Sequence, residues 1–452
     1  MTEDANLCRS KATICSDNHS AVAKSKNVGS HKRSIPGPVS KAVQRWILQV
    51  QSSIPGSIEI DRIDPLPLVN ALSRYTVYGS LLSVRPGLFE TGAWGELFNA
   101  HQSVTASSFY RILAEELRVT HIAYNGTIPA TQSKYGEEEA SNDFGSGLDQ
   151  SQATLLRIPA KIQPLYGYFG PLEDNTTANT DRIRTWPNHK ALPQTFFATV
   201  QQFGISYVFP PIHCMFSRGN TREKERLLNL PAIQSAVHEG QAAGTGCAAV
   251  DLYAGIGYFS FCYAKAGVDT ILAWEVNGWS VEAFRRGAVQ NKWECKIISL
   301  SDDDPVLEEW RVQDHEDEKQ SSAPRLVMFH QSNEYAADEL ERTRHMWPPI
   351  RHVNCGYLPS SGPSWSAAVK ALDPKLGGWL HLHENVKQSD IEAKARDVVV
   401  EIRKLFDAIK AQRGSISSER ERSDVQLEHI ERVKSFAPGI YHCVFDIWVS
   451  GT

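Results

Sequence analysis

Two glycines followed by an acid are spaced along this chain as a nucleoside-binding site requires. Residues 250–253 are apolar enough for a buried strand, and Gly255 and Gly257 then allow a tight turn before a predicted helix. A second apolar run, 270–274, predicts another strand and leads directly into Glu275. In this strand–turn–helix–strand order, an acid at the end of the second strand hydrogen-bonds the ribose hydroxyls of a bound nucleoside.

The type of nucleoside follows from a missing glycine. Ser260 stands where the dinucleotide-binding fingerprint has its third glycine. No pyrophosphate therefore needs close approach, and an adenosine without phosphates fits better, with S-adenosylmethionine the obvious candidate. A Gly-x-Gly pair alone is often only a tight turn, but the acids on either side strengthen the interpretation. The candidate cofactor-binding residues are Asp251, Gly255, Gly257 and Glu275.

A hydroxyl and several cations stand together at the start of a predicted helix, in the sequence MFSRGNTREKER at 215–226. Free backbone N–H groups and the helix dipole attract a carboxylate or a phosphate at such a position. Ser217 and Lys224 are suited to hold the methionyl carboxylate of the cofactor, and Arg218 is suited to contact RNA phosphate. A solvated amphipathic helix explains the same residues equally well, so both alternatives stay open.

Polar side chains also end an apolar strand in the sequence HLHEN at 381–385. The carboxyl ends of parallel strands are where open α/β sheets bind their ligands, which makes His383 and Asn385 candidates for a site. Histidine and asparagine at a strand end also commonly satisfy loop hydrogen bonds, and that alternative remains. The sequence contains neither a P-loop nor a Gly-x-Ser-x-Gly nucleophile elbow.

Composition places the chain among ordinary globular proteins. Its length of 452 residues is enough for two domains. Of these residues 41% are hydrophobic and 22% are charged, which is ordinary for a globular protein. We expect no membrane span, because no apolar stretch approaches the roughly 18 residues that one needs. We expect no secretory signal, because the N-terminal segment has no apolar core. We expect no metal, because the eight cysteines form no Cys-x-x-Cys pair. These thiols are expected to be reduced and structural. The net charge of −5 does not suggest nucleic acid, but much of the acid is local, at 137–139 and 302–318, in predicted surface insertions.

The order of predicted elements gives an α/β protein with four parts. We expect a disordered tail at 1–40, a smaller α+β domain at 41–150, a strand-rich connection at 151–216 and a cofactor-binding domain at 217–452. Asn220 and Glu223 predict a capping box for a helix over 221–228. In the last domain the strands predict a mostly parallel sheet, closed by an antiparallel hairpin around Pro438-Gly439.

Four sequence blocks stand out along the chain. They are MFSRGN at 215–220 with Glu223-Lys224, VDLYAGIGYF at 250–259, GYLPSS at 356–361 with HLHEN at 381–385, and FAPGIYHCVFD at 436–446. Taken in order, these blocks resemble the tRNA wybutosine-synthesizing protein 2 family. The resemblance covers most of 151–452, with a looser similarity over 75–129. A sister family, the tRNA guanine-37 N1-methyltransferases, shares the fold and has the first, second and last blocks in altered form.

The resemblance implies a Rossmann-like class I methyltransferase fold and an unusual use of S-adenosylmethionine. Members of the family transfer the 3-amino-3-carboxypropyl group, not the methyl group, to the tricyclic base 4-demethylwyosine at position 37 of tRNA-Phe. The product released is 5′-methylthioadenosine. A sulfonium has three electrophilic carbons, and the one held in line with the nucleophile reacts. The expected partner is the anticodon arm of tRNA-Phe, and we expect a cytoplasmic monomer.

The family's cofactor contacts map onto Ser217, Lys224 and Glu275. Ser332 and Asn333 stand where the family has Asp-Asn near the adenine, so Ser332 replaces an acid. A neutral hydroxyl still accepts the bond from the adenine amino group, and we expect weaker adenine selection, not lost activity. The residues expected to contact substrate or RNA are Arg218, Asn220, Pro359, Ser360, His383 and Asn385.

Two other functions remain open on the sequence. A guanine-37 N1-methyltransferase of the sister type would transfer the methyl group to the same position of tRNA. A non-catalytic RNA-binding module would have kept the fold without the reaction, although the intact Gly255 and Gly257 with Glu275 argue against this. The sequence does not reveal a general base.

Overall fold

The computed structural model describes residues 37–53, 63–100, 106–125, 162–171, 186–187, 190–299, 324–413 and 424–451. Residues from Pro38 onward form one unit by their contacts. The predicted tail up to residue 36 and the two predicted acidic insertions, at 137–139 and 302–318, lie outside the described residues.

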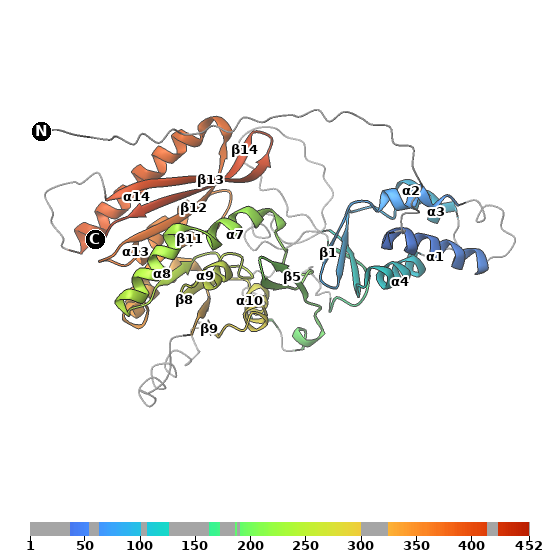
Figure 1. Cartoon of the computed structure of the whole chain (residues 1–452), viewed down its shortest axis with the longest axis horizontal. Coiled ribbons are helices and arrows are strands. Elements are labelled where there is room, and N and C mark those ends of the chain that lie inside the picture. The colour runs from blue at the N-terminus through green and yellow to red at the C-terminus, as the bar shows by residue number, and fades with distance from the viewer. Residues whose placement is uncertain are drawn as a thin grey trace, which may run out of the picture. The chain divides into compact units, whose positions relative to one another are not determined.

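The N-terminal part is a four-stranded sheet packed against helices (Figure 1). The helices bury a cluster of aromatic rings in which Trp94 lies 4.2 Å from Phe109 and 5.7 Å from Trp46, centroid to centroid. The strand order is β1-β2-β3-β4, and β4 pairs antiparallel with β3, so this sheet takes in part of the predicted connection at 151–216. The elements are α1 (Pro38–Ser53), α2 (Pro65–Ala71), β1 (Tyr75–Tyr78), β2 (Leu81–Val84), α3 (Gly92–Ala100), α4 (Ala106–Leu117), β3 (His121–Tyr124) and β4 (Gln163–Tyr166).

The C-terminal part is built on an eight-stranded sheet with the order β13-β14-β12-β11-β7-β8-β10-β9. The six strands from β12 to β9 are parallel, and the β13–β14 hairpin closes the edge in antiparallel pairing. This confirms the predicted Rossmann-like, mostly parallel sheet with a C-terminal hairpin. The strands are β7 (Ala248–Asp251), β8 (Thr270–Glu275), β9 (Cys295–Ser299), β10 (Leu326–His330), β11 (Ile350–Cys355), β12 (Gly378–Lys387), β13 (Val425–Ala437) and β14 (Ile440–Val449).

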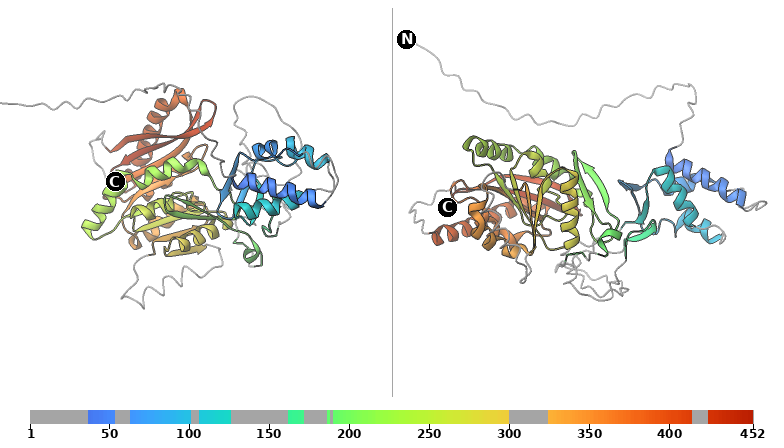
Figure 2. Two further views of the ribbon diagram at one scale, coloured as in Figure 1. Left: turned by 45° about the vertical axis from the view of Figure 1, so that its right-hand side comes forward. Right: turned by 90° about the horizontal axis from the view of Figure 1, so that it is seen from below.

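Helices cover both faces of this sheet (Figure 2), because alternate side chains of each buried strand point to opposite faces. One apolar cluster joins Ile271 and Met328 to the helices α7 to α10 and to the β5–β6 hairpin. The other joins Leu272 and Phe329 to α12, α13 and α14. These elements are β5 (Ala198–Gln202), β6 (Ile205–Phe209), α7 (Thr221–Leu228), α8 (Pro231–Ala243), α9 (Ser260–Ala266), α10 (Gly278–Gln290), α12 (Ala336–Thr343), α13 (Trp365–Ala371) and α14 (Ile391–Gln412). Short 3-10 turns complete the described elements: η2 (Leu192–Gln194), η3 (Arg218–Asn220), η4 (Asn333–Tyr335), η5 (Arg344–Met346), η6 (Gly362–Ser364) and η7 (Gln388–Asp390).

The strand order reverses direction at β7. From β7 the chain moves to β8 and β10 on one side, and later to β11 and β12 on the other. Loops that leave the carboxyl ends of β7 and β11 therefore diverge and leave a crevice between them, which is where open α/β sheets bind ligands. The topology alone places the functional site at this edge.

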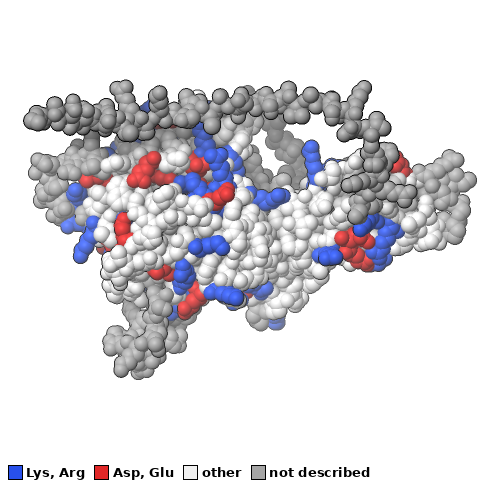
Figure 3. Space-filling view, viewed as in Figure 1, with Lys and Arg blue, Asp and Glu red and all other residues white. Residues whose placement is uncertain are grey.

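The surface charges and the cysteines say less about the position of the site than the sheet topology does. On the face shown in Figure 3, Lys and Arg lie intermixed with Asp and Glu, without one extended patch of a single sign. Among the described residues, no helix combines the length and apolarity that crossing a membrane would need. The described cysteines form no disulfides, and five of these six are buried. Within the same residues, no three His, Cys, Asp or Glu side chains gather as a metal site would require.

Candidate functional site

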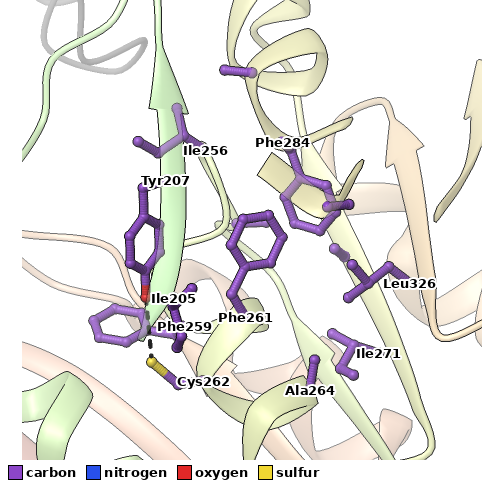
Figure 4. Packing of buried hydrophobic residues seen from close by; sticks show 14 of the residues in the cluster. Ile205, Tyr207, Ile256, Phe259, Phe261, Cys262, Ala264, Ile271, Phe284 and Leu326 are labelled. Carbon is purple, nitrogen blue, oxygen red and sulfur yellow. Dashed lines mark hydrogen bonds between the residues drawn. The ribbon is translucent and has the colours of Figure 1, made fainter. Parts of the chain in front are cut away.

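The predicted glycine turn follows β7 in the structure. Gly255 and Gly257 both adopt positive φ, +56° and +96°, which other residues rarely accept. A Cβ added to Gly257 would lie 2.6 Å from the Phe261 ring. Figure 4 shows that ring packed between Tyr207 and Phe284, with centroid distances of 5.7 and 4.8 Å. Both glycines are therefore required by local geometry, and the core behind them keeps the turn in place.

Glu275 is the last residue of β8, and its carboxylate binds the backbone of this turn. Its Oε2 accepts a hydrogen bond from the Gly255 backbone N–H at 2.9 Å, and its Oε1 accepts one from the Asn277 N–H at 2.8 Å. Burial raises the pKa of the Glu275 carboxyl, and the backbone donors oppose that rise. The carboxylate thus sits at a cavity wall with a fixed orientation, as a ligand of ribose hydroxyls must.

One cavity opens at the predicted edge of the sheet, and several predicted residues line it. Its walls come from the segment before α7, from the loops after β7 and β11, from the end of β8, from α10, and from β12, β13 and β14. The predicted residues that line it are Ser217, Asn220, Gly255, Glu275 and His383.

Asp251 lies behind the turn and does not line this cavity. It is completely buried, and its Oδ2 accepts a hydrogen bond from Ser260 Oγ at 2.7 Å. Its Oδ1 accepts from Asn354 Nδ2 at 3.0 Å. Asp251 therefore ties β7 to the start of α9 and to β11, which indicates a structural role for it. The serine in place of the third fingerprint glycine is one of its two side-chain partners.

Lys224 also lies behind the wall of the cavity, and the direct cofactor contact predicted for it has no support in this geometry. Its Nζ donates to Gln202 Oε1 at 2.9 Å and stands 3.9 Å from the centroid of the Tyr207 ring. Burial lowers the pKa of the Lys224 ammonium to about 7. Tyr258 contacts both residues and lines the cavity: its ring lies 4.8 Å from Nζ, and its hydroxyl accepts from the Ser217 N–H.

The predicted capping box at the start of α7 is wrong. Asn220 occupies the N-cap position but its side chain makes no cap hydrogen bond. The Glu223 carboxylate is instead held by Arg226 on both oxygens, at 2.7 and 2.8 Å. The half-buried Arg226 outcompetes a backbone N–H for this carboxylate because the bond is charge-assisted and bidentate. Arg218 is exposed and donates to Thr76 Oγ1 at 2.7 Å.

The residues predicted near the adenine lie at the carboxyl end of β10. Asn333 Nδ2 donates to the Leu252 carbonyl at 2.8 Å, which joins this end to the loop after β7. Ser332 Oγ accepts from the Glu334 N–H at 3.3 Å and caps η4. Neither side chain lines the cavity, and their proposed role stays a prediction.

The block at 356–361 is tied to β12. Leu358 lines the cavity, and the following peptide bond to Pro359 is cis. The Pro359 carbonyl accepts from the Asn385 N–H at 2.8 Å, and Ser360 Oγ donates to Glu384 Oε1 at 2.9 Å. Pro359, Ser360 and Asn385 do not line the cavity themselves, so the structure gives them a part in holding the loop.

His383 reaches the cavity from β12 together with a residue that the sequence did not single out. Its Nδ1 lies 2.9 Å from Nε2 of His442, which comes from β14. Both rings are buried, and both line the cavity. The pairing of β12 with β14 brings them together, because Asn385 and His442 are register partners. The sequence showed both blocks but not this register.

A buried polar network continues beneath the histidine pair. His381 Nδ1 lies 2.7 Å from Asp446 Oδ1, and the Arg226 guanidinium binds the same carboxylate. Burial alone would raise the pKa of Asp446, but His381 and Arg226 hold it well below its usual range. His352 extends the network with Nδ1 3.1 Å from His381 Nε2. This network fixes α7 to β12 and β14 and so supports the cavity wall.

Two tyrosines in the cavity wall were also not singled out from the sequence. Tyr253 follows β7, Tyr357 follows β11, and their rings stack with centroids 5.0 Å apart and planes 20° from parallel. They bridge the two diverging loops at the reversal point of the sheet. Lys434, from β13, is another cavity residue that the sequence did not single out.

Comparisons with known proteins identify relatives of this chain. No family model matches it. The tRNA wybutosine-synthesizing protein 2 of Schizosaccharomyces pombe is 33% identical over 376 residues, which are 83% of this chain and 72% of that protein. The protein of the same name from Saccharomyces cerevisiae is 31% identical over 310 residues, 66% of this chain and 57% of that protein. Among solved structures, Pyrococcus horikoshii TYW2 in complex with MeSAdo aligns with 91% of this chain and all of that one, at a TM-score of 0.46 and 15% identity.

Proposed function

We infer that this chain, which belongs to the tRNA wybutosine-synthesizing protein 2 family, transfers the 3-amino-3-carboxypropyl group of S-adenosylmethionine to the tricyclic base 4-demethylwyosine in tRNA-Phe. It is a transferase of tRNA modification, and 5′-methylthioadenosine is its second product. The observation that carries this conclusion is the sequence identity with the fission yeast relative, which extends over most of both chains.

The residues around the cavity fit an adenosine-containing donor. The Glu275 carboxylate has a fixed orientation beside Gly255, and both residues line the cavity. The carboxylate would accept from the ribose hydroxyls, and the rigid turn would keep the sugar against the end of β7.

The bound donor supplies a sulfonium whose carbons are already activated toward a nucleophile. The chain's own residues therefore have to select one carbon by orientation. Ser217 lines the cavity beside Asn220 at the free start of α7, where an anionic group is favoured. We propose that this helix start holds the methionyl carboxylate and that Lys224 acts through Tyr258, which it supports from behind.

Three further parts of the proposal are the region of the tRNA that is bound, the oligomeric state and the cellular location. We propose that the anticodon arm of tRNA-Phe is the part bound, with position 37 entering the cavity. Arg218, next to Ser217 in the chain, and Arg222, in α7, are exposed and are candidates for phosphate contacts. We further propose that the enzyme acts as a monomer in the cytoplasm.

A double-label experiment tests the reaction. The enzyme is incubated with tRNA-Phe carrying 4-demethylwyosine and with S-adenosylmethionine labelled either in the methyl group or in the carboxyl group. We expect carboxyl label in the RNA and methyl label in methylthioadenosine. Methyl label in the RNA would instead establish a methyltransferase of the guanine-37 type. Donor binding without transfer of either label would establish a binding module.

A further inference from the structure

One nitrogen of the His383 imidazole, Nε2, has no role in holding the described part of the fold together. The side chain is 1% exposed and lines the cavity. Among the described residues its Nε2 has no hydrogen-bond partner. A buried polar atom without a partner costs free energy, so such an atom at a cavity wall indicates that a ligand completes its bonding.

The other nitrogen of His383 is held in place. Nδ1 lies 2.9 Å from His442 Nε2, and the ring lies 5.1 Å from the Phe259 ring, which follows the glycine turn. The neighbouring Glu384 is held by Ser360, Ser361 and Lys394, which anchors β12 directly after His383. The imidazole is therefore oriented before any ligand arrives.

Burial, together with the charges around it, favours the neutral form of His383. Burial lowers its pKa well below the usual value, and His442, His381 and Arg226 lower it further. Asp446, which lies beneath them, opposes this effect but is already paired with Arg226 and His381. Lys434 adds a cation at the cavity wall. A neutral imidazole that donates from Nδ1 to His442 presents a lone pair on Nε2.

We propose that His383 Nε2 accepts the proton which the tricyclic base loses when its carbon is alkylated, and that His442 is a positioning residue that fixes the required tautomer. This proposal rests on the proposed function. The base carbon forms the new C–C bond with its π electrons, and the electrons of the broken C–S bond stay on sulfur as a neutral thioether. The proton of that base carbon passes to Nε2, and the imidazolium later returns it to solvent.

Single-turnover rates measured over a pH series test the role of His383. We expect His383→Gln to transfer the group about 100-fold or more slowly, the usual effect of removing a general base. Its affinity for methylthioadenosine and for tRNA should match the wild type. The acidic limb of the wild-type pH–rate profile should be absent from the variant. The matched control, His429→Gln, removes an exposed histidine of β13 and should behave like the wild type.

The role of His442 is tested by two replacements of different chemistry. His442→Gln offers a carbonyl that still accepts from His383 Nδ1–H, so its rate should stay near that of the wild type. His442→Leu offers no acceptor and should lose rate with unchanged methylthioadenosine affinity. Equal losses in both variants would show that His442 only fills space, and would overturn the positioning role.

A readout that does not depend on activity is the imidazole ¹⁵N spectrum of the wild-type protein. The signal that His383→Gln removes should be that of a neutral ring protonated on Nδ1, and it should shift when the tRNA substrate binds. A ring protonated on Nε2 at neutral pH would overturn the proposal. Normal transfer by His383→Gln would overturn the role of His383 alone. Absence of aminocarboxypropyl transfer by the wild type would overturn the proposed function as well.

Discussion

Glu275 Oε2 accepts a hydrogen bond from the backbone N–H of Gly255 at 2.9 Å, which joins the end of β8 to the turn after β7. The positive φ of Gly255 aims this N–H at the carboxylate. The same carboxylate lines the cavity, so it connects the conformation of the turn to the ligand. Donor binding and loop geometry are therefore expected to respond together when either residue is changed.

Replacing Glu275 with alanine should weaken donor binding. The variant loses a charged acceptor for the ribose hydroxyls, and such bonds contribute about 1.5–3 kcal/mol. Isothermal calorimetry with S-adenosylmethionine and with methylthioadenosine measures the change. Both ligands should be affected equally, because both carry the ribose.

The matched control for this carboxylate is Glu294→Ala, which removes an exposed acid just before β9. It should bind both ligands as the wild type does. Unchanged affinity in a folded Glu275→Ala variant would remove Glu275 from the site.

Replacing Gly257 with alanine should destabilise the protein. The residue has φ +96°, and the new methyl group would lie 2.6 Å from Phe261, a ring that cannot move because Tyr207 and Phe284 pack on it. We expect a loss of about 1–3 kcal/mol in the free energy of unfolding, measured by urea denaturation.

Gly439→Ala separates the two causes of this loss. Gly439 has φ +71°, but a Cβ there meets no atom within 4 Å. Its replacement carries the backbone strain alone and should cost less than Gly257→Ala. Equal costs would show that the contact with Phe261 adds nothing.

The sequence predicted those parts of the site that depend on neighbouring residues in the chain. The turn with Gly255 and Gly257 and the strand that ends at Glu275 are local patterns. In the structure Gly255 and Glu275 line the cavity, and Gly257 shapes the turn. The capping box at Asn220 failed because Arg226, bound also to Asp446 on β14, takes the carboxylate of Glu223. That competitor is supplied by tertiary structure and has no local signal.

Two further differences between the predicted and the observed site, the histidine pair and the position of Lys224, also depend on tertiary structure. His383 and His442 stand in separate blocks, and only the pairing of β12 with β14 makes them neighbours. Lys224 looked like an anion-binding residue because helix starts attract anions, but the aromatic rings of Tyr207 and Tyr258 enclose its ammonium. A single sequence predicts that α7 begins near residue 221, not which side of α7 is buried.

Binding of tRNA should weaken as salt is added. Contacts between Lys or Arg and phosphates release counterions, so the logarithm of affinity should fall against the logarithm of salt concentration with a slope magnitude of at least about 2. Fluorescence titration of labelled tRNA-Phe measures the slope despite the net charge of −5. Arg222→Ala, which removes an exposed cation bound to Glu431, should reduce the slope. A flat salt response would favour a small-molecule substrate over tRNA.

Lys224 should make the stability of the protein depend on pH above neutrality. Burial lowers its pKa in the folded state from 10.5 to about 7. Between these values the unfolded chain holds the proton and the folded chain does not, so stability rises with pH across this window. The contribution of one such group approaches about 1.4 kcal/mol per pH unit. Below pH 7 both states are protonated, and the cost of burying the ammonium is present in full.

Lys224→Met tests this dependence, because it removes the proton and keeps most of the apolar stem. Urea denaturation between pH 7 and 10 should show that the variant's advantage over the wild type shrinks steadily as pH rises. Lys224→Arg keeps a charge at every pH, so its deficit relative to Lys224→Met should stay constant over the same range. A constant difference between the wild type and Lys224→Met would mean that the buried ammonium stays protonated. The contacts with Gln202 and the rings of Tyr207 and Tyr258 would then stabilise the cation more than burial disfavours it.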